Sequence, residues 1–307
     1  MLTKAYNNRV KYDIVVFVAS PFTEEEKNST YSLAGEGVTV KFVLDNPGLK
    51  TMVNRLSPER KQYVFNRCNL TDYPENWEKF SFWTDCREKL TRGMYRLAYN
   101  WQAEFRSLHI WNYPVLKSYD WMLWIDTDGF ASQVWKQDPI AFGIRNNLAM
   151  LFDNYPKGKQ RGDDWNVRIR EAFGHDICNM RLENGHLAAD YECPNGSGIM
   201  DIHGFMHFTN LKFFRSLPQM YWSKILIGDQ FCTRRYDDQA AVSGASVALA
   251  ANYSWDMRSN GINLQLFHNY AMDGKEKAGG FKGWWKNNGK EKFPEAYGVC
   301  EITAAGR

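Results

Sequence analysis

The segment Trp121-Met-Leu-Trp-Ile-Asp-Thr-Asp128 decides the fold. Its first five residues are apolar and predict a buried strand. Asp126 and Asp128 follow directly, and in an open α/β sheet ligands bind beyond the carboxyl ends of the strands. Carboxylate oxygens are the ligands that Mg²⁺ and Mn²⁺ prefer. We therefore predict a divalent metal site centred on Asp126 and Asp128, with a solvent-facing turn at the strand end as the alternative.

The amino-terminal residues predict the opening of a doubly wound α/β sheet. Residues 13–19 and 38–44 are apolar runs that indicate two strands, the first of them central and buried. Between them, Thr23 and Glu26 have the spacing of a capping box, which predicts that a helix begins there. A strand, a helix and a second strand in this order are typical of Rossmann-like sheets. The fold class is therefore predicted as α/β.

We predict a single domain over residues 1–307, because no internal repeat or linker divides the chain. The polar stretch 154–198 is predicted to be a lid or an insertion over the site, and residues 275–307 a wrapping tail. The further elements expected are a helix over about 85–110, a strand over 148–152, a short helix near 165–173 and a small-residue helix over 237–251.

The composition excludes some classes of protein. The 38 basic and 35 acidic residues give a formal net charge of +3, and there is no basic tract, so we exclude nucleic acid as a partner. No stretch approaches the roughly 20 apolar residues that cross a membrane. The 12 Trp, 16 Tyr and 19 Phe form an unusually aromatic set. We expect most of them in the core and the remainder to stack against sugars or a nucleobase.

Cysteines and glycosylation sequons bear on the compartment. None of the six cysteines forms a CxxC pair, so a zinc ribbon is not expected. The even number of cysteines favours the secretory pathway, as do four Asn-X-Ser/Thr sequons. The chain is expected to be cytoplasmic if it is full length, and luminal if it is a catalytic domain cut from its anchor. The sequons begin at Asn28, Asn69, Asn195 and Asn252.

Several polar residues have two interpretations each. Asp237 and Asp238 open a helix, where they either complement its dipole or position and deprotonate an acceptor hydroxyl. His268 is either a hydrogen-bonded structural residue or a metal ligand. His203 and His207 have the spacing of a helical metal pair, but the apolar residues around them favour a strand.

Motifs along the chain match, in order, those of one known family. Residues 21–25, Pro-Phe-Thr-Glu-Glu, look like its PFSEE segment, and His268 falls at its metal-binding His. Asp126 falls at the Glu of its EP motif and Asp238 at the Asp of its RWGDAP segment. From about residue 15 to residue 270 the chain thus resembles the fungal Golgi α-1,2-mannosyltransferases, glycosyltransferase family 15, which have a GT-A fold. Other matches are Phe105, Ser107, Trp111, Pro114, Leu116, Tyr119 and the run Phe213-Phe-Arg-Ser216.

The resemblance implies a donor and metal site. Asp126 and His268 would hold Mn²⁺ or Mg²⁺. Asp128 stands in place of a family glycine, so the motif reads more like the DxD of other GT-A enzymes, and Asp128 is expected as a further ligand. Phe105 and Ser107 would bind the donor together with the two aspartates. The fold implied is a mixed central sheet flanked by helices. If the chain is a truncated catalytic domain, the resemblance places it in the Golgi lumen.

The chain departs from the family at the reacting centre. The family's Glu near the anomeric carbon, proposed as a nucleophile, is His207 here, and Asn210 stands at the Asp that follows. This exchange argues against a covalent Glu intermediate. We expect His207 near the reacting carbon or the acceptor hydroxyl, and Asp238 as the carboxylate that orients the acceptor or accepts its proton.

The function predicted is transfer of a hexose from a nucleoside-diphosphate sugar to a hydroxyl of an oligosaccharide or glycoprotein glycan. Mannose from GDP-mannose, with the configuration retained, is the first choice, and a UDP-sugar the second. A catalytically inactive carbohydrate-binding protein is a further alternative. A metal-dependent phosphoryl- or nucleotidyltransferase is the least favoured, and no Walker A motif occurs.

Overall fold

A computed structural model of the chain describes residues 2–18, 21–44, 57–59, 62, 102–126, 129–131, 133–152, 163–175, 177, 179–191, 202, 204–227, 238–264, 266–267 and 291. The helices are α1 (Asn8–Val10), α2 (Glu24–Ala34), α6 (Pro139–Arg145), α7 (Asp163–Phe173), α8 (Leu211–Phe214), α9 (Leu217–Ile227) and α10 (Asp238–Ala250). The strands are β1 (Ile14–Val18), β2 (Val40–Leu44), β3 (Trp121–Ile125), β4 (Phe130–Ala131), β5 (Met150–Phe152), β6 (Asn179–Glu183), β7 (His186–Asp190), β8 (Met206–Asn210), β9 (Ser254–Asp256) and β10 (Leu266–Phe267). Short helical turns span Thr3–Asn7, Phe105–His109, Ile110–Asn112, Pro114–Leu116 and Ala251–Tyr253.

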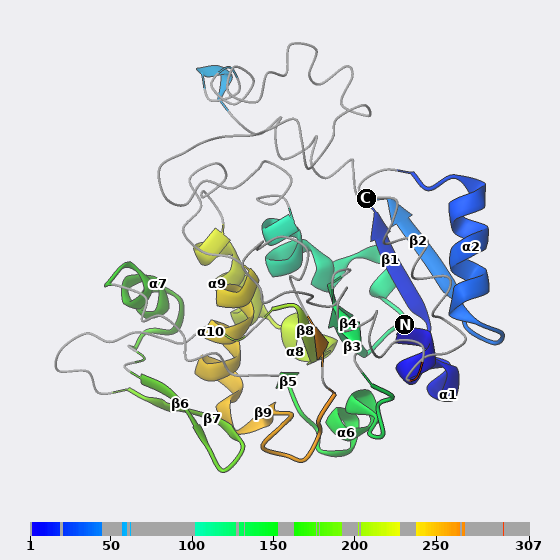
Figure 1. Cartoon of the computed structure of the whole chain (residues 1–307). Coiled ribbons are helices and arrows are strands. Elements are labelled where there is room, and N and C mark those ends of the chain that lie inside the picture. The colour runs from blue at the N-terminus through cyan, green and yellow to red at the C-terminus, as the bar shows by residue number, and fades with distance from the viewer. Residues whose placement is uncertain are drawn as a thin grey trace, which may run out of the picture.

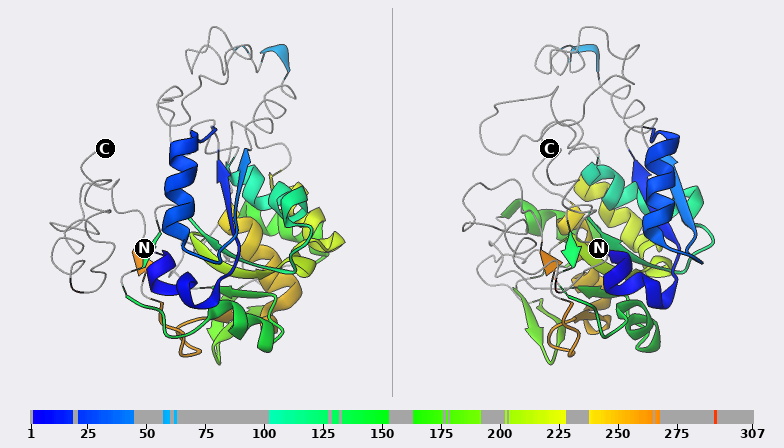
Figure 2. Two further views of the ribbon diagram at one scale, coloured as in Figure 1. Left: turned by 90° about the vertical axis from the view of Figure 1, so that its right-hand side faces the viewer. Right: turned by 45° about the vertical axis from the view of Figure 1, so that its right-hand side comes forward.

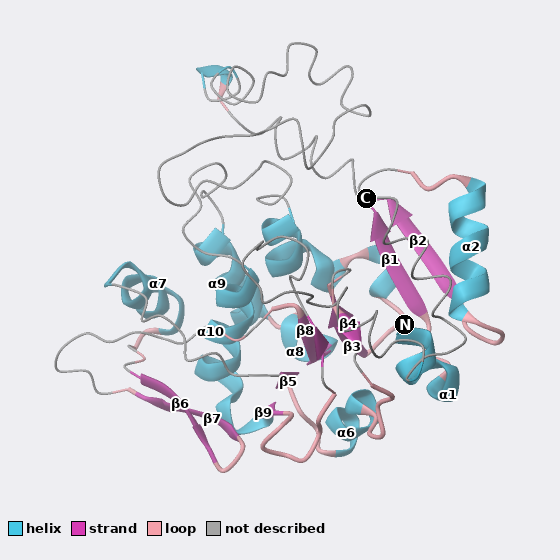
Figure 3. Cartoon of the chain, viewed as in Figure 1, coloured by secondary structure: helices cyan, strands magenta, loops and turns pink. Residues whose placement is uncertain are grey.

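A mixed sheet of six strands forms the centre of the described structure, in the order β3-β8-β5-β9-β7-β6 (Figure 1). β5 and β9 run parallel, and the other neighbouring pairs are antiparallel. Figure 3 shows the helices gathered around these strands. The prediction of an α/β fold with a mixed central sheet flanked by helices is therefore confirmed.

The sheet has a buried core on each of its two faces. Successive side chains of a strand point to opposite faces, and β5 shows this alternation: Met150 and Phe152 join one core cluster, and Leu151 joins the other. The first cluster, which we call the α10 face, also contains residues of α9 and α10. The second includes residues of α6 and of the amino terminus. Trp124 of β3 packs on the α10 face.

β1 and β2 form a separate parallel pair, with α2 on the side away from the six-stranded sheet (Figures 1 and 2). The predicted capping box is present: the Glu26 amide donates to Thr23 Oγ1 at 3.2 Å, and the Thr23 amide donates to Glu26 Oε2 at 2.7 Å. The prediction of β1 as a central, buried strand is wrong for the described residues, because β1 pairs with β2 alone and most of its residues are half-buried. Its apolar side chains are covered by aromatic rings: Phe17 lies 5.1 Å from Phe105 and 5.3 Å from Tyr113, between ring centroids.

The other sequence predictions have mixed outcomes. The strand at 121–125 is confirmed as β3, but its predicted burial is wrong: β3 lies at the edge of the described six-stranded sheet, is half-buried, and leaves Trp121 exposed. The strand over 148–152 and the helices near 165–173 and over 237–251 are confirmed as β5, α7 and α10. Of the helix predicted over 85–110, the described end, 102–109, is helical. No helix of the described residues is long and apolar enough to cross a membrane.

The stretch predicted as a lid or insertion, 154–198, contributes regular structure to the domain. Its described part contains α7, which packs against α9, and the antiparallel hairpin of β6 and β7. The hairpin lies at the edge of the sheet opposite β3. Apart from Glu291, the predicted tail at 275–307 lies outside the described residues, as do all six cysteines.

Gly244 allows α10 to pack closely on α9, and we expect a side chain there to be destabilising. A Cβ atom at Gly244 would lie 2.4 Å from Cζ2 of the buried Trp222 ring. Gly244→Ala should lower the free energy of unfolding by about 1–3 kcal/mol through overpacking, although alanine favours a helix by about 1 kcal/mol. Urea denaturation followed by circular dichroism measures the change.

The matched control is a double-mutant cycle with Trp222→Phe, which shortens the opposing ring. Trp222→Phe alone also removes the hydrogen bond that Trp222 Nε1 donates to the Ala241 carbonyl. The double variant should nevertheless be more stable than the sum of the single changes predicts. Additive effects would contradict the steric explanation.

Candidate active site

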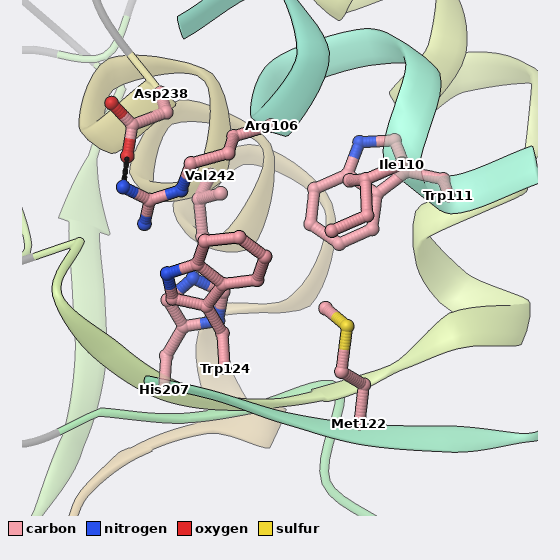
Figure 4. Close-up of a pocket in the computed structure, with 8 residues that line it drawn as sticks. All are labelled: Arg106, Ile110, Trp111, Met122, Trp124, His207, Asp238 and Val242. Carbon is pink, nitrogen blue, oxygen red and sulfur yellow. Dashed lines mark ion pairs between the residues drawn. The ribbon is translucent and has the colours of Figure 1, made fainter. Parts of the chain in front are cut away.

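Three of the predicted site residues come together at the edge of the six-stranded sheet. Asp126 follows the last residue of β3, His207 lies in β8, and Asp238 begins α10. Trp124 and His207 are directly paired in the antiparallel register of β3 and β8. Figure 4 shows that Arg106, from the turn Phe105–His109, lies between the Trp124–His207 pair and Asp238.

Arg106 bridges the two carboxylates of the site. Its Nη1 lies 3.2 Å from Asp126 Oδ1 and 2.9 Å from Asp238 Oδ2. The side chains are only 7% exposed for Arg106, 8% for Asp238 and 18% for Asp126. Ion pairs with so little solvent around them are screened much less than pairs on the surface. The guanidinium thus compensates two carboxylates that would otherwise be costly to bury.

Trp124 and Gly204 hold the guanidinium in place. The Arg106 guanidinium lies over the Trp124 ring, with Cζ 4.5 Å from a ring centroid, and Trp124 Nε1 donates to Asp126 Oδ1 at 2.5 Å. Arg106 Nη2 donates to the Gly204 carbonyl. A Cβ atom at Gly204 would lie 2.7 Å from Asp238 Oδ2 and 3.3 Å from Arg106 Nη2. Only glycine therefore allows this backbone to approach the ion pair so closely.

His207 is a buried, neutral residue on the α10 face. It is 2% exposed, and burial lowers the pKa of its ring to about 3, with the Arg106 charge acting in the same direction and Asp126 opposing it. Within the described part of the chain, Nδ1 has no hydrogen-bond partner. A small cavity of about 10 Å³ borders the ring and is also lined by Arg106, Trp124 and Asp238. This is close to the space that one water molecule needs.

Two of the four residues predicted to bind the donor, Phe105 and Ser107, are in the core. Phe105 is 4% exposed and packs against Phe17 and Tyr113. Ser107 is fully buried; its carbonyl accepts from Trp111 Nε1 at 2.8 Å, and its hydroxyl has no partner in the described structure. Arg106, between these two, was missed by the sequence analysis. Its own residue pattern carries no signal; only its position between Phe105 and Ser107, which match the family, could have indicated it.

Asp126 offers a divalent cation one suitable ligand. Its carboxylate oxygens are hard donors, and they lie at the carboxyl end of β3 where the metal was predicted. Asp128 and His268 lie outside the described residues. Among the residues that are described, no three His, Cys, Asp or Glu side chains gather to hold a metal ion. A cation at Asp126 would have to share this carboxylate with Arg106.

Comparison with known proteins identifies the fold. No family model matches the chain, and no curated protein matches it. The solved structure of core-mannan synthase A from Aspergillus fumigatus, in an Mn/GDP form, has a TM-score of 0.58 and 17% identity, over 88% of this chain and 68% of that one. The mannosyltransferase Ktr4p from S. cerevisiae in complex with GDP has a TM-score of 0.60 and 16% identity, over 88% and 66%.

A second Ktr4p structure has a TM-score of 0.59 and 15% identity, over 88% of this chain and 65% of that one. The chain thus spans about two thirds of the length of these proteins. The predicted structural resemblance to this group of mannosyltransferases, and the GT-A type of fold, are confirmed.

The burial of His207 predicts a specific pH dependence of stability. The folded-state pKa of about 3 lies below the ordinary value of 6.5. Between pH 6.5 and pH 3 the unfolded chain binds a proton at His207 that the folded protein does not bind. The contribution of His207 to the free energy of unfolding therefore keeps its full value above pH 6.5 and decreases as the pH falls towards 3. We compare wild type with His207→Phe in EDTA, so that no metal ion contributes to stability. Between pH 6 and pH 4 the free energy of unfolding should change with pH less steeply in the variant, by about 1 kcal/mol per pH unit.

Urea denaturation of wild type and His207→Phe at several pH values measures this difference. Parallel curves for the two proteins would contradict a neutral, buried His207.

Proposed function

We propose that the chain is a metal-dependent glycosyltransferase that moves a hexose from a nucleoside-diphosphate sugar to a glycan hydroxyl. The observation that carries the proposal is the convergence of Asp126, at the carboxyl end of β3, with Asp238, at the start of α10. It occurs in a fold like that of two solved mannosyltransferases, one in an Mn/GDP form and one with GDP. We propose residues 1–307 as one catalytic domain, with a lid role for part of 154–198.

The donor site is assigned to the strand end. Asp126, with Asp128 and His268 as further ligands, would hold Mn²⁺ or Mg²⁺, which neutralises charge on the departing nucleoside diphosphate. GDP-mannose is the first choice of donor because the structural neighbours are mannosyltransferases, and GDP is present in two of those structures. A UDP-sugar is the second choice.

The acceptor side is assigned to Asp238. Its carboxylate lies in the first turn of α10 beside Arg106, where it would orient an acceptor hydroxyl or accept its proton. His207 would lie next to the reacting carbon and offer a neutral nitrogen there. Because an imidazole has no carboxylate oxygen with which to form a glycosyl ester, we propose that a retaining reaction proceeds on the face from which the diphosphate departs.

The test is calorimetric titration of GDP, UDP, GDP-mannose and UDP-glucose, first with Mn²⁺ and then with EDTA. Binding of one nucleotide in Mn²⁺ and its loss in EDTA is the expected result, and it names the donor base. If no nucleotide binds but a glycan does, without metal, the chain is instead a carbohydrate-binding protein without catalysis. The neutral His207 in place of a carboxylate favours this second function.

Asp126→Asn should abolish metal-dependent nucleotide binding and sugar transfer, because it removes the carboxylate charge while keeping the side-chain shape. The matched control is Asp120→Asn just before β3, where the carboxylate is 47% exposed and lies 3.4 Å from Lys212 Nζ. The control should bind and turn over like wild type. Circular dichroism verifies that both variants are folded, and normal turnover by Asp126→Asn would refute the assignment.

A further inference from the structure

Arg106 already provides a positive charge between the two carboxylates of the proposed site. One nitrogen atom, Nη1, is within 3.2 Å of both Asp126 Oδ1 and Asp238 Oδ2. The Arg106 side chain is 7% exposed, and its guanidinium stacks on the Trp124 ring. Because so little water screens these charges, a metal ion that approaches Asp126 interacts strongly with the Arg106 guanidinium.

The contacts of Asp126 limit how it can take a metal ion. Its Oδ1 accepts a hydrogen bond from Trp124 Nε1 at 2.5 Å and faces Arg106 Nη1 at 3.2 Å. A divalent cation needs direct contact with a carboxylate oxygen, and the positive charge of Arg106 beside the same carboxylate opposes its binding by repulsion. A guanidinium stays protonated in proteins. Loss of a proton therefore cannot remove Arg106 as a competitor.

A diphosphate can draw the Arg106 guanidinium away from Asp126. The planar fork of arginine binds phosphate oxygens through two parallel hydrogen bonds. The contacts of Arg106 with Asp238 and with the Gly204 carbonyl keep the side chain within the site while it shifts. The nucleoside diphosphate of the proposed donor is an anion of this kind.

We propose that Arg106 couples metal binding at Asp126 to the binding of a diphosphate. Without a diphosphate, Arg106 competes with the metal ion; with one, it pairs with phosphate oxygens and leaves Asp126 to the metal. The identity of the anion rests on the proposed function, whereas the competition between Arg106 and the metal does not. By linkage, each ligand raises the affinity of the other by the same factor.

The first test compares Mn²⁺ affinity without nucleotide in wild type and Arg106→Gln, from the electron paramagnetic resonance signal of free Mn²⁺. Removal of the competing charge should tighten Mn²⁺ binding by about tenfold. The matched control is Arg145→Gln, which removes an exposed guanidinium that lies over the Phe142 ring. Its Mn²⁺ affinity should stay within about twofold of wild type, because exposed distant charges are screened.

The second test repeats the titrations with the nucleotide that binds, at saturation. In wild type the nucleotide should raise the Mn²⁺ affinity, and in Arg106→Gln the rise should be about tenfold smaller. If Arg106→Gln does not fold, Arg106→Lys replaces it. A single ammonium group cannot reproduce the fork that contacts both carboxylates and Gly204, so it should bind Mn²⁺ more tightly than wild type, by about threefold.

Equal Mn²⁺ affinities of wild type and the Arg106 variant without nucleotide would overturn the competition. If nucleotide raises the Mn²⁺ affinity of wild type and of the Arg106 variant by the same factor, the coupling through Arg106 is overturned. If no nucleotide binds to any of the proteins, the proposed transferase function fails instead. In that case tighter Mn²⁺ binding by the variant would still identify Arg106 as the competitor.

Discussion

The arrangement of the site depends on one ion-pair cluster, in which the Arg106 guanidinium compensates Asp126 and Asp238. Burying two carboxylates within a few ångströms of each other is unfavourable unless a cation lies between them. The guanidinium is held in this position because it stacks on the Trp124 ring and because its Nη2 donates a hydrogen bond to the Gly204 carbonyl. The cluster thereby joins the end of β3, the turn before β8 and the first turn of α10.

The alternation of side chains along the strands explains why these residues share one layer. Trp124 and His207 are opposite each other in β3 and β8, and both belong to the face of the sheet that α10 covers. The next residues along each strand, Ile125 and Phe208, pack into the other core. A shift of one residue in the register would exchange these sets and move the aromatic support away from Arg106.

Local patterns were sufficient to predict the elements but not their assembly. The capping box of α2, the strand β3 and the small-residue helix α10 each follow from a few adjacent residues, and each is confirmed. An apolar run such as β1 predicts a buried strand, but it does not say which elements cover the strand or how completely. In the described structure the cover includes aromatic side chains such as Phe105 and Tyr113.

Local patterns also predicted the two carboxylates of the site but not the arginine between them. Asp126 was found because it follows an apolar run, and Asp238 because it opens a helix and matches a family motif. Arg106 has no such signal of its own. It lies in the helix predicted over about 85–110, and its partners come from distant parts of the chain. Contacts of this kind depend on tertiary packing, which periodicity does not reveal.

The charge of the cluster bears on which function it can serve. Asp126, Asp238 and Arg106 together carry one negative charge, which repels a nucleoside diphosphate. A divalent cation at Asp126 would supply positive charge that offsets this repulsion. A neutral glycan is not repelled by this charge, so its binding needs no additional cation. Metal dependence of nucleotide binding is thus expected of a transferase at this cluster, and it separates that proposal from simple carbohydrate binding.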